Sequence, residues 1–306
     1  MDSLVTPSKI ALITGANGYI GSELANHLSR HGWVVNVIVR PKSDRYLLER
    51  QGSSSRFLTH LYDGTAKSLL AAVEKSQPDV VFHLASAVLS EQDPDNIDLM
   101  LEANIRFGVH LAQAMSSMGV TKLVNTGTFW QHYDGKPYDP VNLYAATKQA
   151  LEALLQFYVN AHGLSVINLK LYDTYGDNDP RPKLLNLLKK TFQEGKLLAM
   201  SPGEQKVDLV HVDDVVTAYE LAADRLITGK VDGMEGYAVS SSQPVTLKAL
   251  LELIEEVTGK TLPVQLGERP YRDREVMEPW VGEFLPKWKP EINLKQGIHR
   301  VFSKNL

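Results

Sequence analysis

The sequence predicts an α/β fold with a doubly wound parallel sheet and a smaller, interleaved C-terminal lobe. Two patterns in the first half of the chain predict it: short apolar runs alternate with amphipathic stretches, and a glycine-rich turn joins the first run to the first stretch. Apolar runs rich in β-branched residues are typical of strands covered on both faces. Their alternation with helices implies right-handed crossovers in a parallel sheet.

Six strands and the helices between them are expected in this half. The expected strands are 9–15, 33–40, 56–62, 79–85, 122–127 and 165–172. The expected helices include 21–32, 65–76 and 104–119, and glycine ends several of them, as it commonly ends helices. Beyond residue 172 the alternation becomes irregular, and stretches rich in Gly, Pro, Asp and Asn predict loops. No internal repeat is evident.

The bulk composition excludes several classes of protein. The chain has 306 residues, of which 43% are apolar and 22% charged, as in ordinary globular proteins. The net charge of −4 argues against nucleic acid as the main partner. The chain has no cysteine, which excludes disulfides and thiolate ligands, and no metal site is predicted. It shows no signal peptide and no membrane-length apolar run, so a soluble cytoplasmic protein is expected.

The turn after the first strand carries the spacing G-x-x-G-x-x-G, with Gly15, Gly18 and Gly21. Glycine lets the backbone reverse sharply, approach a pyrophosphate at the helix N-terminus, and pack the helix closely against the strand. A tight strand-to-helix turn without a ligand is the alternative reading. The position of this turn near the start of a βαβ series favours dinucleotide binding. Asn17, Tyr19 and Ile20 are the other cofactor candidates in this turn.

The end of the second strand predicts which dinucleotide binds. Folds that bind NAD usually carry an acidic residue there to accept hydrogen bonds from the ribose. Arg40 stands in that place, with Lys42 and Ser43 nearby. A guanidinium can bind a 2′-phosphate with two parallel hydrogen bonds, so we predict NADP(H). The alternative is a solvated arginine at a strand end.

Further cofactor candidates follow the third and fourth strands. Asp63, before Gly64, has two open readings: an acceptor for the adenine amino group, or a turn aspartate. Leu84, Ala85 and Ser86 end the fourth strand, where small residues let backbone and cofactor meet. His83 in the same run is expected to be a core histidine and not a catalytic residue.

A possible proton-transfer pair begins the helix after the fifth strand. Tyr144 and Lys148 are four residues apart and share a helix face. About one such pair is expected by chance in a chain with 12 tyrosines, so the context decides. A phenol has a pKa near 10, and both an ammonium and an oxidised nicotinamide favour its ionised form. Thr126, at the end of the fifth strand, could hydrogen-bond the reacting oxygen.

The order of these motifs resembles the extended short-chain dehydrogenase/reductases, with the sugar-nucleotide epimerase/dehydratase branch the most similar. The glycine turn, the threonine, Y-x-x-x-K, "VDLVHVDD" and "PYRDREV" follow one another along nearly the whole chain. The resemblance implies a nucleotide-sugar substrate and a catalytic triad of Thr126, Tyr144 and Lys148. Thr128 is the alternative hydroxyl, and Asn104 falls where the family often places an active-site asparagine. Tyr172 is a further cofactor candidate.

Departures from the family pattern narrow the predicted reaction. Sugar dehydratases carry Asp-Glu after the threonine, whereas Gly127 and Thr128 follow here, which argues against dehydration. The usual tyrosine of "VYG" is replaced by Trp130, and the usual arginine of "VDLVHVDD" is Val207, for which Lys206 could compensate. Trp130 and His132 have two open readings: contact with substrate, or plain packing.

The segment 169–183 is similar to that of reductases acting on CDP-4-keto-dideoxyhexoses, the paratose- and abequose-forming enzymes. We therefore predict an NADPH-dependent 4-ketoreductase of a CDP- or dTDP-4-keto-deoxyhexose. A 4-epimerase with tightly held NAD and a non-catalytic NADP-binding regulator are the alternatives. The substrate candidates besides Thr128, Trp130 and His132 are Asp173, Thr174, Arg181, Lys183 and Arg272. Arg181, Lys183 and Arg272 are the candidate diphosphate partners.

The resemblance also predicts the organisation of the whole chain. The expected dinucleotide-binding domain is 1–172, with a return at about 209–238. The expected substrate-binding lobe is 173–208 and 239–306. A homodimer is predicted by resemblance, through the helices that follow the fourth and fifth strands.

Overall fold

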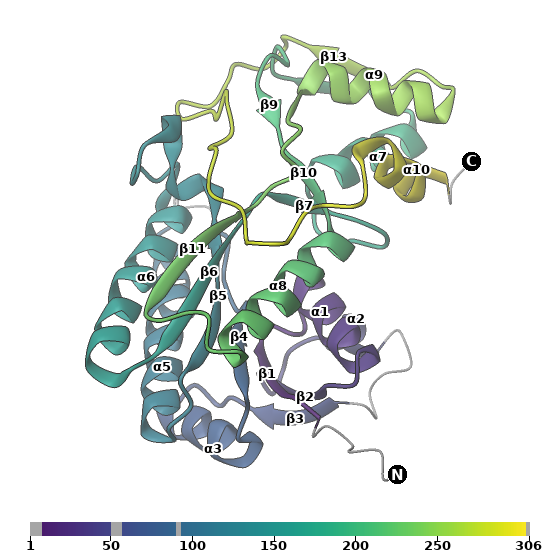
Figure 1. Cartoon of the computed structure of the whole chain (residues 1–306). Helices are drawn as coiled ribbons and strands as arrows, with labels where there is room; N and C mark the ends of the chain where they lie inside the picture. The colour runs from purple at the N-terminus through teal and green to yellow at the C-terminus, as the bar shows by residue number, and fades with distance from the viewer. Residues whose placement is uncertain (1–7, 50–56, 90–92, 304–306) are drawn as a thin grey trace. The chain divides into compact units, whose positions relative to one another are not determined.

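The computed structural model describes residues 8–49, 57–89 and 93–303, and the chain forms two compact units (Figure 1). Unit 1 comprises Met1–Thr126, Thr147–Leu169 and Tyr219–Gly236. Unit 2 comprises Gly127–Ala146, Lys170–Ala218 and Tyr237–Leu306. These bounds come from contacts within the chain, so the assignment of one domain to cofactor and one lobe to substrate stays a prediction.

A seven-stranded sheet forms the centre of the fold, in the order β11-β6-β5-β4-β1-β2-β3. Its strands are β1 Ile10–Thr14, β2 Val34–Val39, β3 Phe57–Leu61, β4 Val80–His83, β5 Lys122–Thr128, β6 Ser165–Leu171 and β11 Met234–Val239. The β1–β2, β2–β3, β1–β4 and β4–β5 pairs are parallel. The strand order reverses between β1 and β4, the kind of position where open α/β sheets bind ligands. The predicted doubly wound fold is confirmed.

Helices cover the sheet in unit 1. They are α1 Tyr19–Arg30, α2 Tyr46–Glu49, α3 Ala66–Ser76, α4 Pro94–Leu101, π-helix η1 Glu102–Arg106, α5 Phe107–Ser117, and parts of α6 Leu143–His162 and α8 Val212–Ile227. Helices α3, α5 and α6 share one apolar cluster, which includes Leu69, Leu111, Leu151 and Leu155. Helices α1 and α8 lie on the other face (Figure 1). The inner strands β1, β4, β5 and β6 are therefore buried on both faces, as their apolar runs predict, whereas the edge strand β3 is mostly exposed.

Unit 2 has its own small core. Its helices are η2 Phe129–Gln131, η3 Tyr133–Gly135, α7 Leu184–Glu194, α9 Leu247–Thr258 and α10 Leu294–Ser303. Its short strands, β7 Asp173–Tyr175 with β10 Leu209–His211, β9 Lys206–Val207 with β12 Val245–Thr246, and β8 Leu198–Met200 with β13 Val264–Leu266, form three pairs. Leu188, Leu250, Ile254 and Phe302 pack together between the helices.

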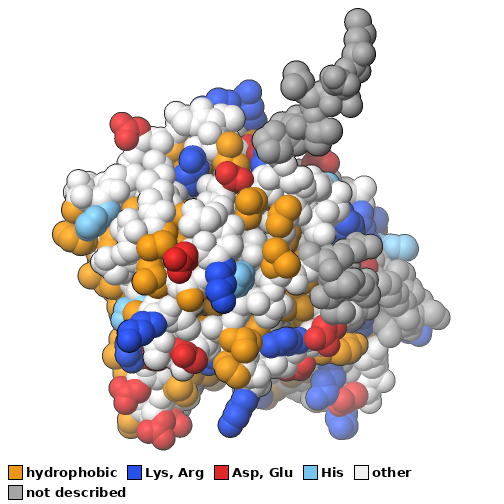
Figure 2. All heavy atoms as spheres, turned by 90° about the horizontal axis from the view of Figure 1, so that it is seen from below, with side chains coloured by type: hydrophobic (Ala, Val, Ile, Leu, Met, Phe, Trp, Pro, Cys, Tyr) orange, Lys and Arg blue, Asp and Glu red, His pale blue; other side chains and the backbone are white. Residues whose placement is uncertain are grey.

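The surface of the described residues is mixed in character. On the face drawn in Figure 2, basic and acidic side chains are interspersed among small apolar groups. Within the described ranges, none of the helices has both the length and the apolar character needed to cross a membrane.

Candidate active site

The glycine turn between β1 and α1 leaves almost no room for side chains. Gly15 has a φ of 73°, and a Cβ added there would lie 2.6 Å from the amide nitrogen of Ala85. A Cβ at Gly21 would lie 2.2 Å from the carbonyl oxygen of Gly15. Gly18 is the N-cap residue of α1, and it has no side chain that could accept a hydrogen bond. The amides of the first helical turn have no acceptor within the helix, so a ligand can bind them. Such a helix end suits a phosphate group.

The ends of β2 and β3 carry the residues predicted to read the adenosine part of the cofactor. Arg40 and Lys42 are exposed, and the amide of Ser43 donates to the Arg40 carbonyl at 3.0 Å. The Asp63 carboxylate accepts hydrogen bonds from the amide and the hydroxyl of Thr65, at 2.9 and 2.7 Å. These bonds lower the pKa of Asp63. Asp63 therefore makes the hydrogen bonds of a turn aspartate, and an adenine contact at this residue stays a prediction.

Asn104 fixes the segment after β4. Its side-chain oxygen accepts from the Ser86 hydroxyl at 3.1 Å and from the Ala87 amide at 2.7 Å. Its amide group donates to the Ala87 carbonyl and to the Thr147 hydroxyl, both at 2.9 Å. Asn104 lies in the π-helix η1, a distortion common at functional sites. Its side chain thus joins the end of β4 to the start of the unit 1 part of α6.

Lys148 is a buried lysine of unit 1. It is 1% exposed, and its Nζ has no hydrogen-bond partner among the residues that the structure describes. Burial lowers its pKa to about 8, although the charge of Glu152 opposes this. Tyr144 precedes it by four residues on the continuous helix α6, one helical turn earlier.

His83 is a core residue, as the sequence predicts. It is buried at the end of β4, and its Nδ1 lies 2.8 Å from the Thr14 hydroxyl. Burial, with a smaller effect from Lys148, lowers its pKa to about 3, so the ring is neutral. Its Nε2 has no partner within the described part of the chain.

The two candidate hydroxyls of β5 have different surroundings. The Thr126 hydroxyl lies 2.7 Å from the hydroxyl of Tyr219, which comes from α8. Thr128 instead caps η2: its hydroxyl accepts from the Trp130 amide at 3.3 Å, and its amide donates to Gln131 at 2.9 Å. Sequence reasoning missed Tyr219, because a tyrosine on the apolar face of an amphipathic helix is indistinguishable from a core residue.

In unit 2, the Trp130 ring contacts two other predicted site residues, Tyr144 and Lys183. Its ring lies 6.5 Å from the ring of Tyr144, nearly perpendicular to it. The Nζ of Lys183 lies 5.7 Å from the centre of the same indole. At this distance the face of the Trp130 ring attracts the Lys183 ammonium, an arrangement that suits an aromatic residue at the border of a binding site.

The predicted cations of unit 2 act electrostatically on Asp173. Burial raises the pKa of Asp173, and the positive charges of Lys183, Arg181 and Arg272 oppose this rise. Lys183 and Arg272 are exposed. Arg181 differs from them, because its guanidinium binds both carboxylate oxygens of Asp179 and the Thr174 carbonyl. Arg181 therefore braces its own loop.

His132 and Tyr172 pack around Trp280. The His132 ring stacks on Trp280 at 4.0 Å between centroids, and its Nε2 lies 2.8 Å from Nζ of Lys170. Burial and the charge of Lys170 lower the pKa of His132, so a neutral ring accepts from Lys170. The Tyr172 hydroxyl donates to the Trp280 carbonyl, and burial raises its pKa. Trp280 was not singled out from the sequence.

A pocket of about 430 Å³ lies beside this cluster in unit 2. It is lined by Tyr133–Gly135 and Glu275–Val281. Arg274 stacks over the ring of Tyr133 at 4.2 Å and pairs with Asp139. Lys206, considered as a replacement for the missing arginine, pairs with Glu278 at 2.9 Å.

The residues of unit 1 fit a nicotinamide dinucleotide. The glycine turn leads directly into the N-terminus of α1, and Nζ of the buried Lys148 lacks a partner among the described residues. A pyrophosphate and ribose hydroxyls would satisfy these groups.

Comparisons with known proteins identify similar sequences and similar folds. Residues 11–233 match the family model described as the NAD dependent epimerase/dehydratase family. A CDP-abequose synthase of Yersinia pseudotuberculosis is 28% identical over 272 residues, covering 88% of this chain and 90% of that protein. A UDP-glucose 4-epimerase of Thermotoga maritima, solved with UDP-glucose, has a TM-score of 0.81 at 22% identity, with 96% and 97% of the chains covered. A Thermus thermophilus UDP-glucose 4-epimerase in complex with NAD has a TM-score of 0.77 at 24% identity, with 96% and 97% covered.

Proposed function

Because the chain belongs to the NAD dependent epimerase/dehydratase family, we propose that it is an NADPH-dependent 4-ketoreductase of a nucleotide-activated deoxysugar. It is an NAD(P)-dependent enzyme of the extended short-chain dehydrogenase/reductase type. Its predicted resemblance to CDP-abequose synthases is confirmed by relatives that span most of the chain. The proposed substrate is a CDP- or dTDP-4-keto-deoxyhexose.

The buried amine of Lys148, one turn after Tyr144, carries the proposal. When bound, NADPH supplies the hydride that reduces carbon 4 of the sugar. Tyr144 donates a proton to the oxygen of that carbonyl, so the product is an alcohol and the phenol becomes a phenolate. The Lys148 ammonium stabilises this phenolate and holds the nicotinamide ribose. The hydroxyl of Thr126, or alternatively of Thr128, hydrogen-bonds the reacting oxygen and fixes its position.

The preference for NADPH rests on Arg40 and Lys42. Both are exposed at the end of β2, where a 2′-phosphate would bind, and neither is paired with a carboxylate in the described residues. A net reductase needs a cofactor that leaves after each turnover and is replaced by its reduced form. A 2′-phosphate held by surface cations suits such exchange.

Lys183 and Arg272 are the proposed partners of the substrate diphosphate. They are exposed, and both act electrostatically on Asp173. Asp173 and Thr174 belong to the same proposed substrate segment. The internal pairing of Arg181 with Asp179 supports a bracing role for that arginine and makes it the weakest of the three candidates.

The second candidate function is a 4-epimerase, because two of the solved structures of similar fold are UDP-glucose 4-epimerases, and one of these two holds NAD. An epimerase retains its cofactor through oxidation and re-reduction and consumes no NADPH. A non-catalytic NADP-binding regulator would bind the cofactor and turn over nothing.

NADPH oxidation across a panel of CDP-, dTDP- and UDP-4-keto sugars tests the proposal. We expect stoichiometric NADPH loss with a 4-keto-deoxyhexose and a product with one defined configuration at carbon 4. Interconversion of 4-epimers without net NADPH loss would instead establish the epimerase. NADPH binding without any turnover would establish the regulator.

Replacing Tyr144 with phenylalanine is expected to lower kcat by about 10²- to 10⁴-fold, because it removes the proton donor. The dissociation constant for NADPH should change little. Tyr138→Phe is the matched control, since Tyr138 is an exposed tyrosine of the same unit. Wild-type turnover in Tyr144→Phe would exclude the mechanism.

Replacing Arg40 with serine is expected to weaken NADPH binding by about 10- to 100-fold, the value of a charge-assisted hydrogen bond of roughly 1.5–3 kcal/mol. NADH binding should be unaffected, because NADH has no 2′-phosphate. Fluorescence titration with both cofactors measures the difference. A wild-type protein that prefers NADH would refute the assignment.

A further inference from the structure

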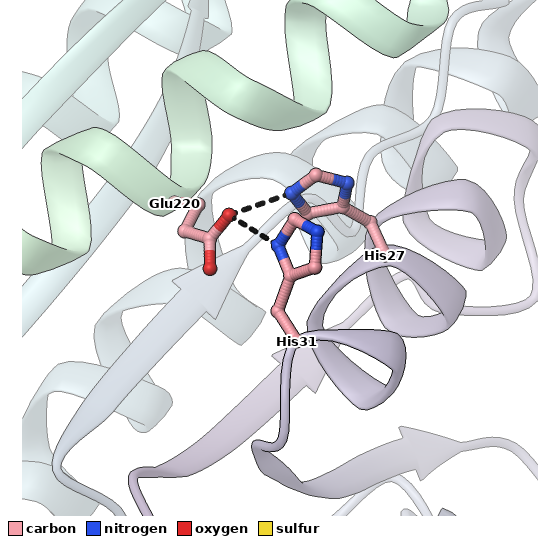
Figure 3. Close-up of side chains that lie close together, drawn as sticks. All are labelled: His27, His31 and Glu220. Carbon is pink, nitrogen blue, oxygen red and sulfur yellow. Dashed lines mark hydrogen bonds and ion pairs between the residues drawn. The ribbon is translucent and has the colours of Figure 1, made fainter.

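We propose that His27, His31 and Glu220 of unit 1 form a binding site for a divalent transition metal ion, of which zinc fits these ligands well (Figure 3). The sequence predicts no metal site, because the ligands come from segments nearly 200 residues apart. The proposal is independent of the reductase function.

The three side chains converge on one point. His27 lies in the last turn of α1 and His31 caps that helix, so the two rings project from one helix face, four residues apart. Glu220 comes from α8. Its Oε2 lies 2.7 Å from Nε2 of His27 and 2.7 Å from Nδ1 of His31. Figure 3 shows both imidazoles directed at this carboxylate, and the candidate ligand atoms lie within 4.8 Å of one another.

The donor set is typical of zinc. Imidazole nitrogens and a carboxylate oxygen bind zinc at about 2.0–2.2 Å, and three protein ligands leave a position for water. Four-coordinate geometry separates neighbouring donor atoms by roughly 3.4 Å at these bond lengths. The nitrogen-to-oxygen distances, now 2.7 Å, would therefore open by about 0.7 Å. The His31 side chain is 50% exposed and free to make this adjustment.

A second layer of contacts holds the carboxylate in place. Nε1 of Trp33 donates to Oε1 of Glu220 at 3.3 Å, which leaves Oε2 directed at the histidines. Such outer contacts orient metal ligands. Burial raises the pKa of Glu220, but the bonds to His27 and His31 outweigh this and lower the pKa to about 2. The carboxylate is therefore ionised at neutral pH, as a metal ligand must be.

The histidines lie at the opposite end of α1 from the glycine turn. The glycine turn begins α1 and the histidines end it, and a helix of 12 residues is about 18 Å long. An ion there would join the end of α1 to α8, two helices on the same face of the sheet. Its expected role is structural.

Zinc titration of the full chain, after treatment with a chelator, tests the site. We expect one zinc ion per chain by calorimetry and a melting temperature that rises with zinc concentration, because an ion bound only to the folded state stabilises it. Cobalt(II) should give the absorption of a four- or five-coordinate ion with nitrogen and oxygen ligands. Absence of stoichiometric zinc binding would overturn the proposal.

Variants locate the bound ion. His31→Ala and Glu220→Gln should each weaken zinc binding by at least about 10-fold and abolish the zinc-dependent rise in melting temperature. Glu220→Gln keeps the shape of the side chain, so its loss of binding would not reflect unfolding. His299→Ala, which removes an exposed histidine on α10, should bind zinc as the wild type does. Equal zinc binding by all three variants would refute the assignment.

Discussion

At the residue scale, Lys148 is a side chain whose proposed function costs the protein folding stability. A buried ammonium that has no partner among the described residues is costly, since burial disfavours its charged form. Its lowered pKa is the direct sign of that cost. Side chains that break the rules of a stable core concentrate at functional sites, where a ligand completes their interactions.

Replacing Lys148 with methionine is expected to raise the free energy of unfolding at pH 7 while abolishing reduction. The usual pKa of 10.5 and the folded value of about 8 differ by an amount worth roughly 3 kcal/mol, an upper limit for the gain. Because the unfolded chain binds this proton more tightly, wild-type stability should rise as the pH increases from about 8 to 10.5. Urea denaturation across this range measures both effects.

The control for this substitution is Lys67→Met, which changes an exposed lysine on α3. It should leave both the stability at pH 7 and the reductase activity near wild type. If Lys148→Met were less stable than the wild type at pH 7, the buried ammonium would not carry the cost assigned to it.

Residue types were predictable from the sequence, but their partners were predictable only where the partner is a near neighbour in the chain. Arg181 has the charge of a phosphate ligand, yet Asp179 occupies its guanidinium. Asp63 has an acceptor carboxylate, yet Thr65 uses it. Tyr219 contacts the predicted Thr126 hydroxyl from a helix more than 90 residues away. The Tyr219 pairing depends on tertiary packing, which no local pattern encodes, whereas the other two pairings join residues only two positions apart.

At the element scale, the β1–α1 turn separates two uses of glycine. Gly21 lies against the carbonyl of Gly15, so its missing side chain permits helix and turn to pack. Gly18 is exposed, and a Cβ there would lie 3.3 Å from the same carbonyl, which a small adjustment accommodates. The motif spacing predicted both positions, and the backbone geometry distinguishes them.

Substituting alanine at each position is expected to give different results. Gly21→Ala should lower the melting temperature and weaken NADPH binding, because its Cβ overlaps the Gly15 carbonyl. Gly18→Ala should keep a melting temperature near wild type but weaken NADPH binding, because its Cβ enters the space proposed for the pyrophosphate. Calorimetric melting and cofactor titration test the pair. Unchanged NADPH affinity in Gly18→Ala would place the pyrophosphate elsewhere.

The π-helix η1 is an element that the sequence did not reveal. The stretch from Glu102 to Arg106 resembles ordinary amphipathic helix, and the expected helix began at residue 104. The wider turn orients Asn104 so that it binds Ala87 and Thr147 at once. A change of helix type over five residues leaves no mark on hydrophobic periodicity.

At the scale of the whole molecule, periodicity predicts the large sheet and helix α9 but not the short strands of the smaller unit. The inner strands β1, β4, β5 and β6 are almost fully buried and form nearly continuous apolar runs, whereas the edge strand β3 is mostly exposed. The strands of unit 2 have two or three residues each, too few to show alternation. Helix α7 follows a proline-rich stretch and was likewise not predicted.

The predicted homodimer stays a prediction, and helix α6 offers the surface to test it. Leu154 and Phe157 are 42% and 58% exposed and lie three residues apart on one helix face. Their adjacency gives a small apolar surface that a second copy of the chain could cover. Phe157→Glu is expected to convert a dimer into a monomer in sedimentation velocity, because a charge would be desolvated in the interface. Leu187→Glu, on α7 with 42% exposure, should leave the dimer intact. A wild-type monomer at micromolar concentration, or a Phe157→Glu dimer, would contradict an α6 interface.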